Sequence, residues 1–98
     1  MRLTNKEHII ICRETKECFG SSAQVFLFGS RVDDSGRGGD IDLLIKSESK
    51  LNDIFRRKIN FIVDLKSKIG DQRIDVVVAE PNDRRDVVRI AETTGVQL

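Results

Sequence analysis

Two aspartates, Asp40 and Asp42, open an apolar run, and their type and spacing are the first indication of chemistry in this chain. Strand side chains alternate between the two faces of a sheet, so Asp40 and Asp42 project from one face and Ile41 from the other. Two carboxylates on one face repel each other unless a cation lies between them. Such ligands suit Mg²⁺, which commonly takes one or two carboxylates together with substrate phosphates. The pair therefore predicts a site for a metal ion and a phosphate group.

A Gly-Ser pair before the aspartates supplies the second half of this site. The apolar run 25–28 stops at Gly29 and Ser30, and a polar Gly-rich loop continues to Gly39. Gly29 permits a close backbone approach or a positive φ, and Ser30 adds a hydroxyl and an N–H that can hold phosphate oxygens. The guanidinium of Arg31 can reach a triphosphate as easily as it can lie in water. We expect Gly29, Ser30 and Arg31 to bind phosphate groups.

The Gly-rich loop does not fit other phosphate or metal motifs. A P-loop needs Gly-Lys followed by Ser or Thr, which the sequence lacks, and a dinucleotide fingerprint runs into a helix rather than a strand. An EF-hand starting at Asp33 would have Arg37 and Leu44 at its fifth and twelfth positions. We interpret Asp33 and Asp34 as solvent-facing turn residues, while Arg37 can face either phosphate or water.

The same residues resemble the signature of a known family. Gly29-Ser30, nine intervening residues and Asp40-Ile41-Asp42 resemble the GS…DxD pattern of the DNA polymerase β-like nucleotidyltransferase superfamily, and GSR…GGDIDLLI resembles its minimal members. A third carboxylate, Asp75, stands where this family places its last metal ligand on a later strand. The resemblance covers roughly residues 23–80. From the residues alone, Asp75 has a second interpretation, an ion pair with Arg73 or a nearby lysine.

The resemblance implies an α/β (α+β) nucleotidyltransferase fold, a mixed three-stranded core sheet with helices packed mainly on one face. It implies that Asp40 and Asp42 hold two Mg²⁺ ions, that Asp75 completes one of them, and that Gly29 and Ser30 hold the phosphates of ATP. Many minimal members are encoded beside a HEPN-domain toxin protein and are viewed as antitoxins that attach AMP to its tyrosine hydroxyl, so the resemblance implies such a role here. Two alternatives stay open: an antitoxin with an idle site that acts by binding its partner, and a small-molecule nucleotidyltransferase of the aminoglycoside type.

Hydrophobic patterning places these residues on definite elements. Thr4 and Glu7 form a capping-box pattern before a helix over residues 5–19, which Gly20 ends. An amphipathic helix over 51–69, with Leu51, Ile54, Phe55, Ile59, Ile62, Leu65 and Ile69 toward the sheet, leads to a strand over 73–79. A last helix is expected over 83–93, with Val87, Val88 and Ile90 as its apolar contacts.

Composition limits the remaining possibilities. The 98 residues make one domain, 1–98, and a net charge of +1 does not imply nucleic acid as a partner. A sheet of so few strands leaves an exposed face or edge, which is compatible with a homo-oligomer or a hetero-complex. No apolar run is long enough to span a membrane and no signal peptide is recognisable, so we expect a cytoplasmic protein. Cys12 and Cys18 lie about 240° apart on their helix and should be free thiols. His8 is expected to be a surface residue outside the site.

Overall fold

The computed structural model describes residues 1–33, 36 and 39–98, so Asp34 and Arg37 lie outside the described residues. The elements follow in the order α1 (Asn5–Phe19), β1 (Gln24–Phe28), a 3₁₀ turn η1 (Gly29–Val32), β2 (Ile41–Lys46), α2 (Ile54–Ile69), β3 (Ile74–Ala79), α3 (Asp86–Thr94) and β4 (Val96–Gln97). Of the helices in these ranges, none combines the length and apolar character that a bilayer span requires.

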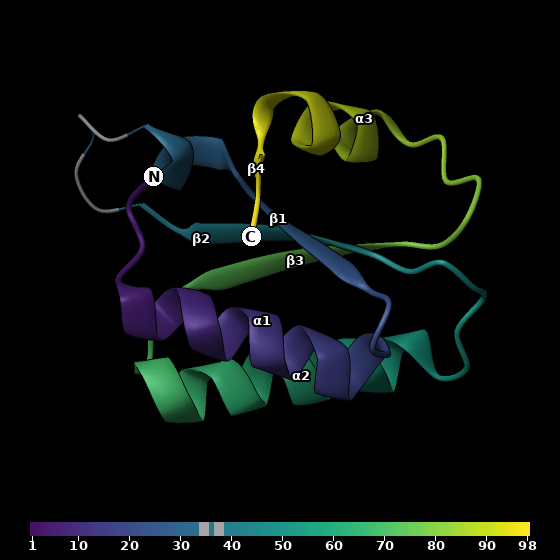
Figure 1. The fold of residues 1–98 in the computed structure, drawn as a ribbon, viewed down its shortest axis with the longest axis horizontal. Helices are drawn as coiled ribbons and strands as arrows, with labels where there is room; N and C mark the ends of the chain where they lie inside the picture. The colour runs from purple at the N-terminus through teal and green to yellow at the C-terminus, as the bar shows by residue number, and fades with distance from the viewer. Residues whose placement is uncertain (34–35, 37–38) are drawn as a thin grey trace.

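The sheet has four strands in the order β3-β2-β1-β4 rather than the three that were expected (Figure 1). β1 runs antiparallel to β2 and β4, and β2 runs parallel to β3 through the α2 crossover. The extra strand consists of two residues, with Val96 opposite Leu27 and Gln97 opposite Phe26. The two residues after Gly95 are too few to show the alternation that predicts a strand, so this pairing arises only from the tertiary fold.

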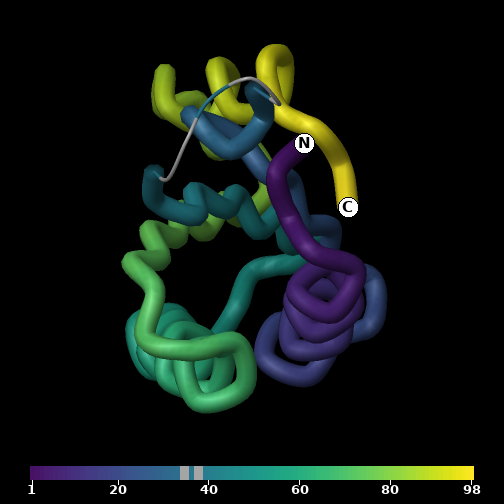
Figure 2. Tube along the Cα trace, turned by 90° about the vertical axis from the view of Figure 1, so that its left-hand side faces the viewer, coloured from purple at the N-terminus to yellow at the C-terminus, as the bar shows by residue number. Residues whose placement is uncertain are grey.

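Helices lie on both sides of the sheet, as the two views show (Figures 1 and 2). α1 and α2 cover one face, where the buried Ile11, Leu27, Leu43, Phe61 and Leu65 belong to the larger core cluster. α3 covers part of the other face, where a smaller cluster joins Leu44, Ala79, Val88 and Ala91. The expectation of helices mainly on one face therefore holds for α1 and α2 but not for α3.

Local signals account well for α1. The Thr4 hydroxyl accepts from the N–H of Glu7, and the Glu7 carboxylate accepts from the N–H of Thr4, which is the predicted capping box. The helix ends at Phe19, and Gly20 follows with a φ of 109°. Cys12 and Cys18 are free thiols, as their positions on this helix require.

The predicted apolar faces of the two later helices need correction. In α2 the fully buried residues are Phe61 and Leu65, whereas Phe55 and Ile59 are 73% and 43% exposed. In α3 the buried residues are Val88 and Ala91, while Val87 and Ile90 are exposed. Each of the two helices has more apolar residues than one helical face can bury, so the spacing of these residues did not identify which of them face the sheet.

α3 begins at Asp86, three residues later than expected. The Asp83 carboxylate accepts from both the backbone N–H and the guanidinium of Arg85. This contact stabilises a turn, and the N-cap residue Arg85 itself has an extended backbone, with φ −61° and ψ 142°. An Asp side chain that binds the backbone two residues later competes with helix formation, which explains the later start.

Candidate functional site

The ends of three strands bring Gly29, Asp42 and Asp75 together. Asp42 lies opposite Asp75 in the parallel ladder of β2 and β3, and opposite Phe28 in the antiparallel ladder of β1 and β2. Gly29 directly follows Phe28, so it reaches the same corner of the sheet. Asp42 is half-buried and Asp75 is exposed, whereas their neighbour Ile41 is fully buried on the α1 and α2 side. The carboxylates therefore occupy the face that carries α3.

The electrostatics of Asp42 indicate a site short of positive charge. Burial raises the pKa of Asp42, and the negative charges of Asp75 and Asp40 together with a hydrogen bond to Asp75 raise it further. A carboxylate in this position is stabilised by a proton or by a cation shared with its neighbours. The donor set is carboxylate oxygen, which is the set that hard divalent ions such as Mg²⁺ prefer, so these residues fit a divalent cation.

Asp40 lies beside this pair but faces a different partner. Its Oδ2 is 3.7 Å from Nε of Arg73, in an ion pair whose side chains are 40% and 80% exposed. Arg73 thus pairs with Asp40 rather than with Asp75, which makes no ion pair within residues 1–33, 36 and 39–98. An exposed pair at this distance is weak, and the Arg73 side chain can leave it at little cost.

Two glycines make room for the polar groups of the site. Gly29 has a φ of 75°, and a Cβ on it would overlap Oδ2 of Asp42. Gly39 has a φ of 88°, and a Cβ on it would overlap Oγ of Ser30. Both positions therefore need glycine for the backbone and for the side chain that lies against it. Ser30 itself is exposed within the 3₁₀ turn η1.

The Arg31 side chain contacts protein groups instead of open solvent. Its Nη1 donates to the carbonyl of Arg2 at 3.0 Å, its Nη2 to Oε1 of Gln72 at 3.2 Å, and its Nε to the carbonyl of Gly39 at 3.3 Å. The predicted phosphate contact of Arg31 stays a prediction, and these three acceptors would have to release part of the guanidinium for it to form.

Arg2 was missed by the sequence reasoning, although it holds η1 in place. Its backbone N–H donates to the carbonyl of Arg31, and its guanidinium donates to the carbonyls of Ser30 and Asp33, both at 2.7 Å. Charged hydrogen bonds to carbonyls of this length fix the turn that carries Ser30. No local signal could reveal them, because the partners lie about thirty positions apart and a basic residue near an N-terminus has no special pattern.

A second polar chain connects α1 to the same turn. Burial alone would raise the pKa of Glu7, but the hydrogen bonds from Gln72 and Thr4 outweigh it and hold that pKa below its usual value. Gln72 donates to Glu7 at 2.7 Å and accepts from Arg31, so its amide links helix and turn. The predicted capping box is thereby coupled to the position of Arg31.

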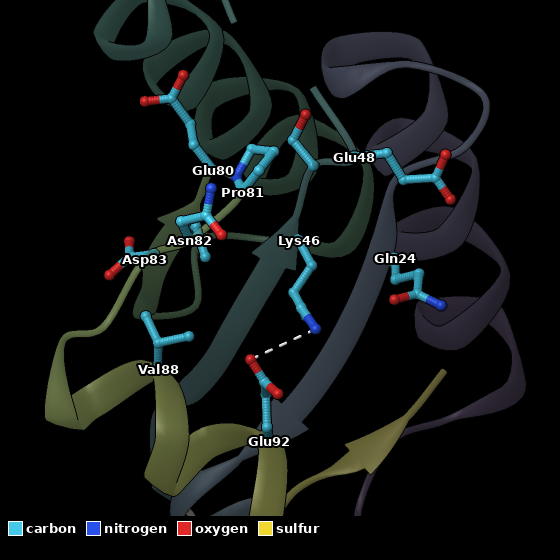
Figure 3. A pocket seen from close by; sticks show the side chains of 11 residues that line it. Gln24, Lys46, Glu48, Glu80, Pro81, Asn82, Asp83, Val88 and Glu92 are labelled. Carbon is cyan, nitrogen blue, oxygen red and sulfur yellow. Dashed lines mark ion pairs between the residues drawn. The ribbon is translucent and has the colours of Figure 1, made fainter. Parts of the chain in front are cut away.

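Two other features could be mistaken for the site. A cavity of about 520 Å³ lies at the opposite ends of β2 and β3, lined by residues that include Lys46, Glu80 and Val88, and Lys46 pairs with Glu92 across it at 3.4 Å (Figure 3). None of the six predicted site residues lines this cavity.

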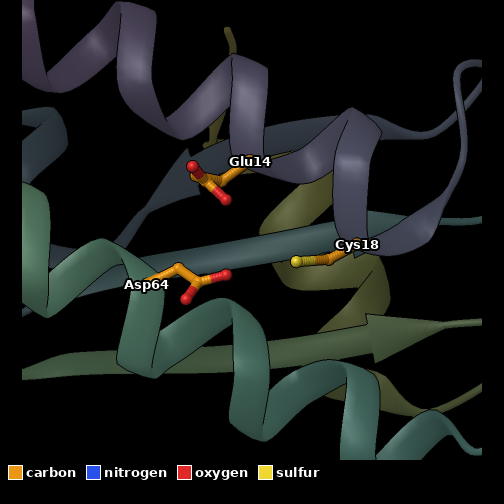
Figure 4. A group of neighbouring side chains, drawn as sticks. All are labelled: Glu14, Cys18 and Asp64. Carbon is orange, nitrogen blue, oxygen red and sulfur yellow. The ribbon is translucent and has the colours of Figure 1, made fainter.

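The second feature is a cluster between α1 and α2, Glu14, Cys18 and Asp64, whose ligand atoms lie within 4.8 Å of one another (Figure 4). Among the described residues it is this group, rather than Asp40, Asp42 and Asp75, that is gathered to such a distance. Glu14 is buried and already forms an ion pair with Lys68, which neutralises it without a metal. Burial, and then the charges of Asp64 and Glu14, raise the pKa of the Cys18 thiol, which disfavours the thiolate that a metal needs.

A family model described as a nucleotidyltransferase domain matches residues 9–96, which includes every predicted site residue. Neither the curated proteins nor the solved structures gave a match.

Proposed function

The chain belongs to the nucleotidyltransferase domain family, and from this premise we propose that it transfers the nucleoside monophosphate of ATP to a hydroxyl group. The observation that carries the proposal is the corner where Asp42 faces Asp75 across the ladder and Gly29 leaves room for the Asp42 carboxylate. This corner joins the two parts of the reaction: a carboxylate pair that calls for cations, and a Gly-Ser turn directly beside it.

Within this proposal each residue has a separate task. Asp40 and Asp42 would hold two Mg²⁺ ions, and Asp75 would complete the one next to the acceptor. Such ions lower the pKa of the attacking hydroxyl and stabilise charge on the transferring phosphate. Ser30 would bind oxygens of the leaving pyrophosphate, and Gly29 would let them approach the backbone. Asp40 would exchange its weak pairing with Arg73 for the metal.

The acceptor that we propose is a tyrosine hydroxyl of a HEPN-domain toxin protein, which would make this chain a cytoplasmic antitoxin. Its support is the resemblance of GSR…GGDIDLLI to the minimal members of the superfamily. The exposed position of Asp75 on the edge strand β3 is compatible with a macromolecular acceptor, because a bulky substrate can reach it from the side of the sheet.

Metal-dependent nucleotide binding is the first test. Calorimetry should detect ATP binding in the presence of Mg²⁺ or Mn²⁺ and little binding in excess EDTA, because the carboxylates repel a triphosphate without cations. Equal ATP affinity under both conditions would remove the metal site from the proposal.

Transfer itself is tested with ATP labelled at the α-phosphate and the HEPN-domain partner. The wild type should label the partner, whereas Asp42→Ala should reduce the rate by on the order of 1000-fold, equivalent to about 4 kcal/mol of transition-state stabilisation. Ser30→Ala should have a smaller effect, because the backbone N–H groups stay in place. Label transfer by Asp42→Ala at the wild-type rate would contradict the assignment.

One observation favours a second candidate, an antitoxin that neutralises its partner by binding alone. Asp40 is paired with Arg73, and the carboxylate oxygens of Asp40, Asp42 and Asp75 do not all lie within 4.8 Å of one another. The two candidates differ in what Asp42→Ala does to neutralisation. If the wild type and Asp42→Ala protect against the toxin equally and no label is transferred, the binding function is the correct one.

A further inference from the structure

The outer side of α2 carries an apolar stripe, Phe55, Ile59 and Val63, that takes no part in the core. These side chains are 73%, 43% and 58% exposed, and none of them belongs to either core cluster. Residues four apart stand one above the other on a helix with a drift of about 40° per step, so the three form a continuous strip over two turns. Isolated exposed apolar residues are ordinary, but an aligned strip is typical of a contact surface.

The contacts of α2 show that this stripe points away from the rest of the protein. Arg57 donates to the carbonyl of Cys18, and Lys68 pairs with Glu14, so these two residues face α1. Ile59 lies about 180° around the helix from Lys68 and about 160° from the buried Phe61. α2 lies beside α1 on the same side of the sheet (Figure 2). The exposed fractions of Phe55, Ile59 and Val63 place the stripe on the side of α2 that faces solvent.

Basic side chains border the stripe on both flanks. Arg56 lies about 60° from Ile59 on one flank and Lys58 about 100° on the other. Within the described part of the chain, neither forms an ion pair, whereas Lys66, near the end of the stripe, pairs with Asp71 at 3.7 Å. The acidic residue of α2, Asp64, belongs to the cluster with Glu14 and Cys18 on the α1 side. The exposed side of α2 is therefore an apolar stripe with a basic residue on each flank.

The basic residues on both flanks determine which kind of partner can bind the stripe. Pairing of the stripe with a second copy would bring basic flanks against basic flanks in either helix orientation, which is unfavourable at an interface. We propose that this stripe docks an amphipathic α-helix of another protein, with apolar anchors spaced three and four residues apart and Asp or Glu beside them. Helix-on-helix docking of this kind combines apolar anchors with a charged rim that selects the partner. The proposal is independent of the nucleotidyl transfer proposed above, because the stripe lies on the opposite side of the sheet from Asp42.

The probes are two synthetic helical peptides with the same leucine spacing, one flanked by Glu and the other by Lys. Fluorescence anisotropy should show binding of the Glu-flanked peptide that is at least about tenfold tighter than that of the Lys-flanked peptide, and this preference should shrink as salt is added. Phe55→Ser and Ile59→Ser should each weaken binding by at least about tenfold. Ile9→Ser is the matched control, since Ile9 is 57% exposed on α1 outside the stripe, and it should bind like the wild type.

A charge-exchange variant sharpens the test. Arg56→Glu combined with Lys58→Glu should reverse the preference toward the Lys-flanked peptide. Circular dichroism melts should show an intact fold, because Arg56 is exposed and Lys58 is only half-buried. The proposal is overturned by equal affinity for both peptides, by no binding of the Glu-flanked peptide, or by an equal loss in Ile9→Ser. It is also overturned if sedimentation shows a dimer of the free protein that Phe55→Ser dissociates, since a second copy would then cover the stripe.

Discussion

The face of the sheet under α1 and α2 is filled with large buried side chains, whereas the face with α3 has a small cluster and an open corner. On the first face Phe19 and Phe61 meet edge to face with their ring centres 5.3 Å apart. On the second face the corresponding space holds Asp42 and Asp75, and burial and like charge raise the pKa of Asp42. Dense apolar packing and crowded carboxylates thus lie on opposite sides of one sheet, and we expect substitutions on the two sides to affect different properties.

The largest effect is expected on the packed face. Phe61→Ala removes a fully buried ring and should lower the free energy of unfolding by about 3–5 kcal/mol, through lost transfer energy and the cavity that it leaves. Urea denaturation measures it. Ile90→Ala on the α3 side is the counterpart, and because Ile90 is 55% exposed its effect should stay within about 0.5 kcal/mol. Similar losses in both variants would show that the two faces do not differ in this way.

A smaller effect is expected at the open corner, from Gly29→Ala. The new Cβ would overlap the Asp42 carboxylate in a backbone with positive φ, so stability should fall by about 1–3 kcal/mol and Mn²⁺ affinity should fall with it. Gly20→Ala separates the two causes, because Gly20 also has a positive φ but has open space around it. Thermal melts and Mn²⁺ titration should therefore show a larger change at Gly29. Equal stability losses with unchanged Mn²⁺ affinity would mean that the Asp42 contact is irrelevant.

Asp75→Asn should stabilise the metal-free protein, whereas the preceding substitutions should destabilise it. It keeps the shape and removes one of the charges that crowd Asp42, so the melting temperature should rise, by an amount equivalent to less than about 1 kcal/mol at this exposed position. The stabilisation by Mg²⁺ should shrink, because linked stability follows affinity for the folded state. Melts of both proteins with and without Mg²⁺ decide it. A clear fall in melting temperature with an unchanged Mg²⁺ response would make Asp75 a structural residue.

The smallest expected effect is a pH dependence of the metal-free protein. Because the folded state raises the pKa of Asp42, it binds this proton more tightly than the unfolded chain does. As the pH falls through the raised pKa toward the ordinary value, stability relative to Asp42→Asn should therefore rise by a few tenths of a kcal/mol. Glu7 has the opposite effect on stability and acts at lower pH. Because its pKa is lowered in the folded state, the stability that it contributes is lost as the pH falls from the ordinary pKa of a glutamate toward the lowered one. Denaturation at several pH values in EDTA measures both, and a flat difference between wild type and Asp42→Asn would contradict the charge crowding.

Local signals made three things predictable from the sequence: the bounds of α1, the faces on which the β2 side chains lie, and the family. The capping box at Thr4 gave α1 its start, Gly20 gave its end, and period-two alternation assigned Asp42 and Ile41 to opposite faces. The membership in a nucleotidyltransferase family followed from the Gly-Ser pair and its distance to Asp40. These signals act within a few residues, which is why they can be read without a structure.

Long-range pairings made the rest unpredictable. The strand of Val96 and Gln97 exists only because β1 offers it a free edge. The pairing of Arg73 with Asp40, and the three acceptors around Arg31, depend on loops that are brought together by the fold. Likewise, period alone assigned Phe55 to the core, because it does not show which of several apolar residues the sheet has room to cover.

The contact of Arg2 with the 3₁₀ turn has a consequence for protein engineering. The residues before α1 look dispensable, yet the carbonyls of Ser30, Arg31 and Asp33 all bind the Arg2 backbone or side chain. A chimera that exchanges the first helix together with its leading residues would therefore also exchange the support of the Gly-Ser turn. Such a chimera can fold normally around its core and still lack the hydrogen bonds that hold the 3₁₀ turn. Segments 1–4 and 29–33 therefore need to be transplanted as one unit.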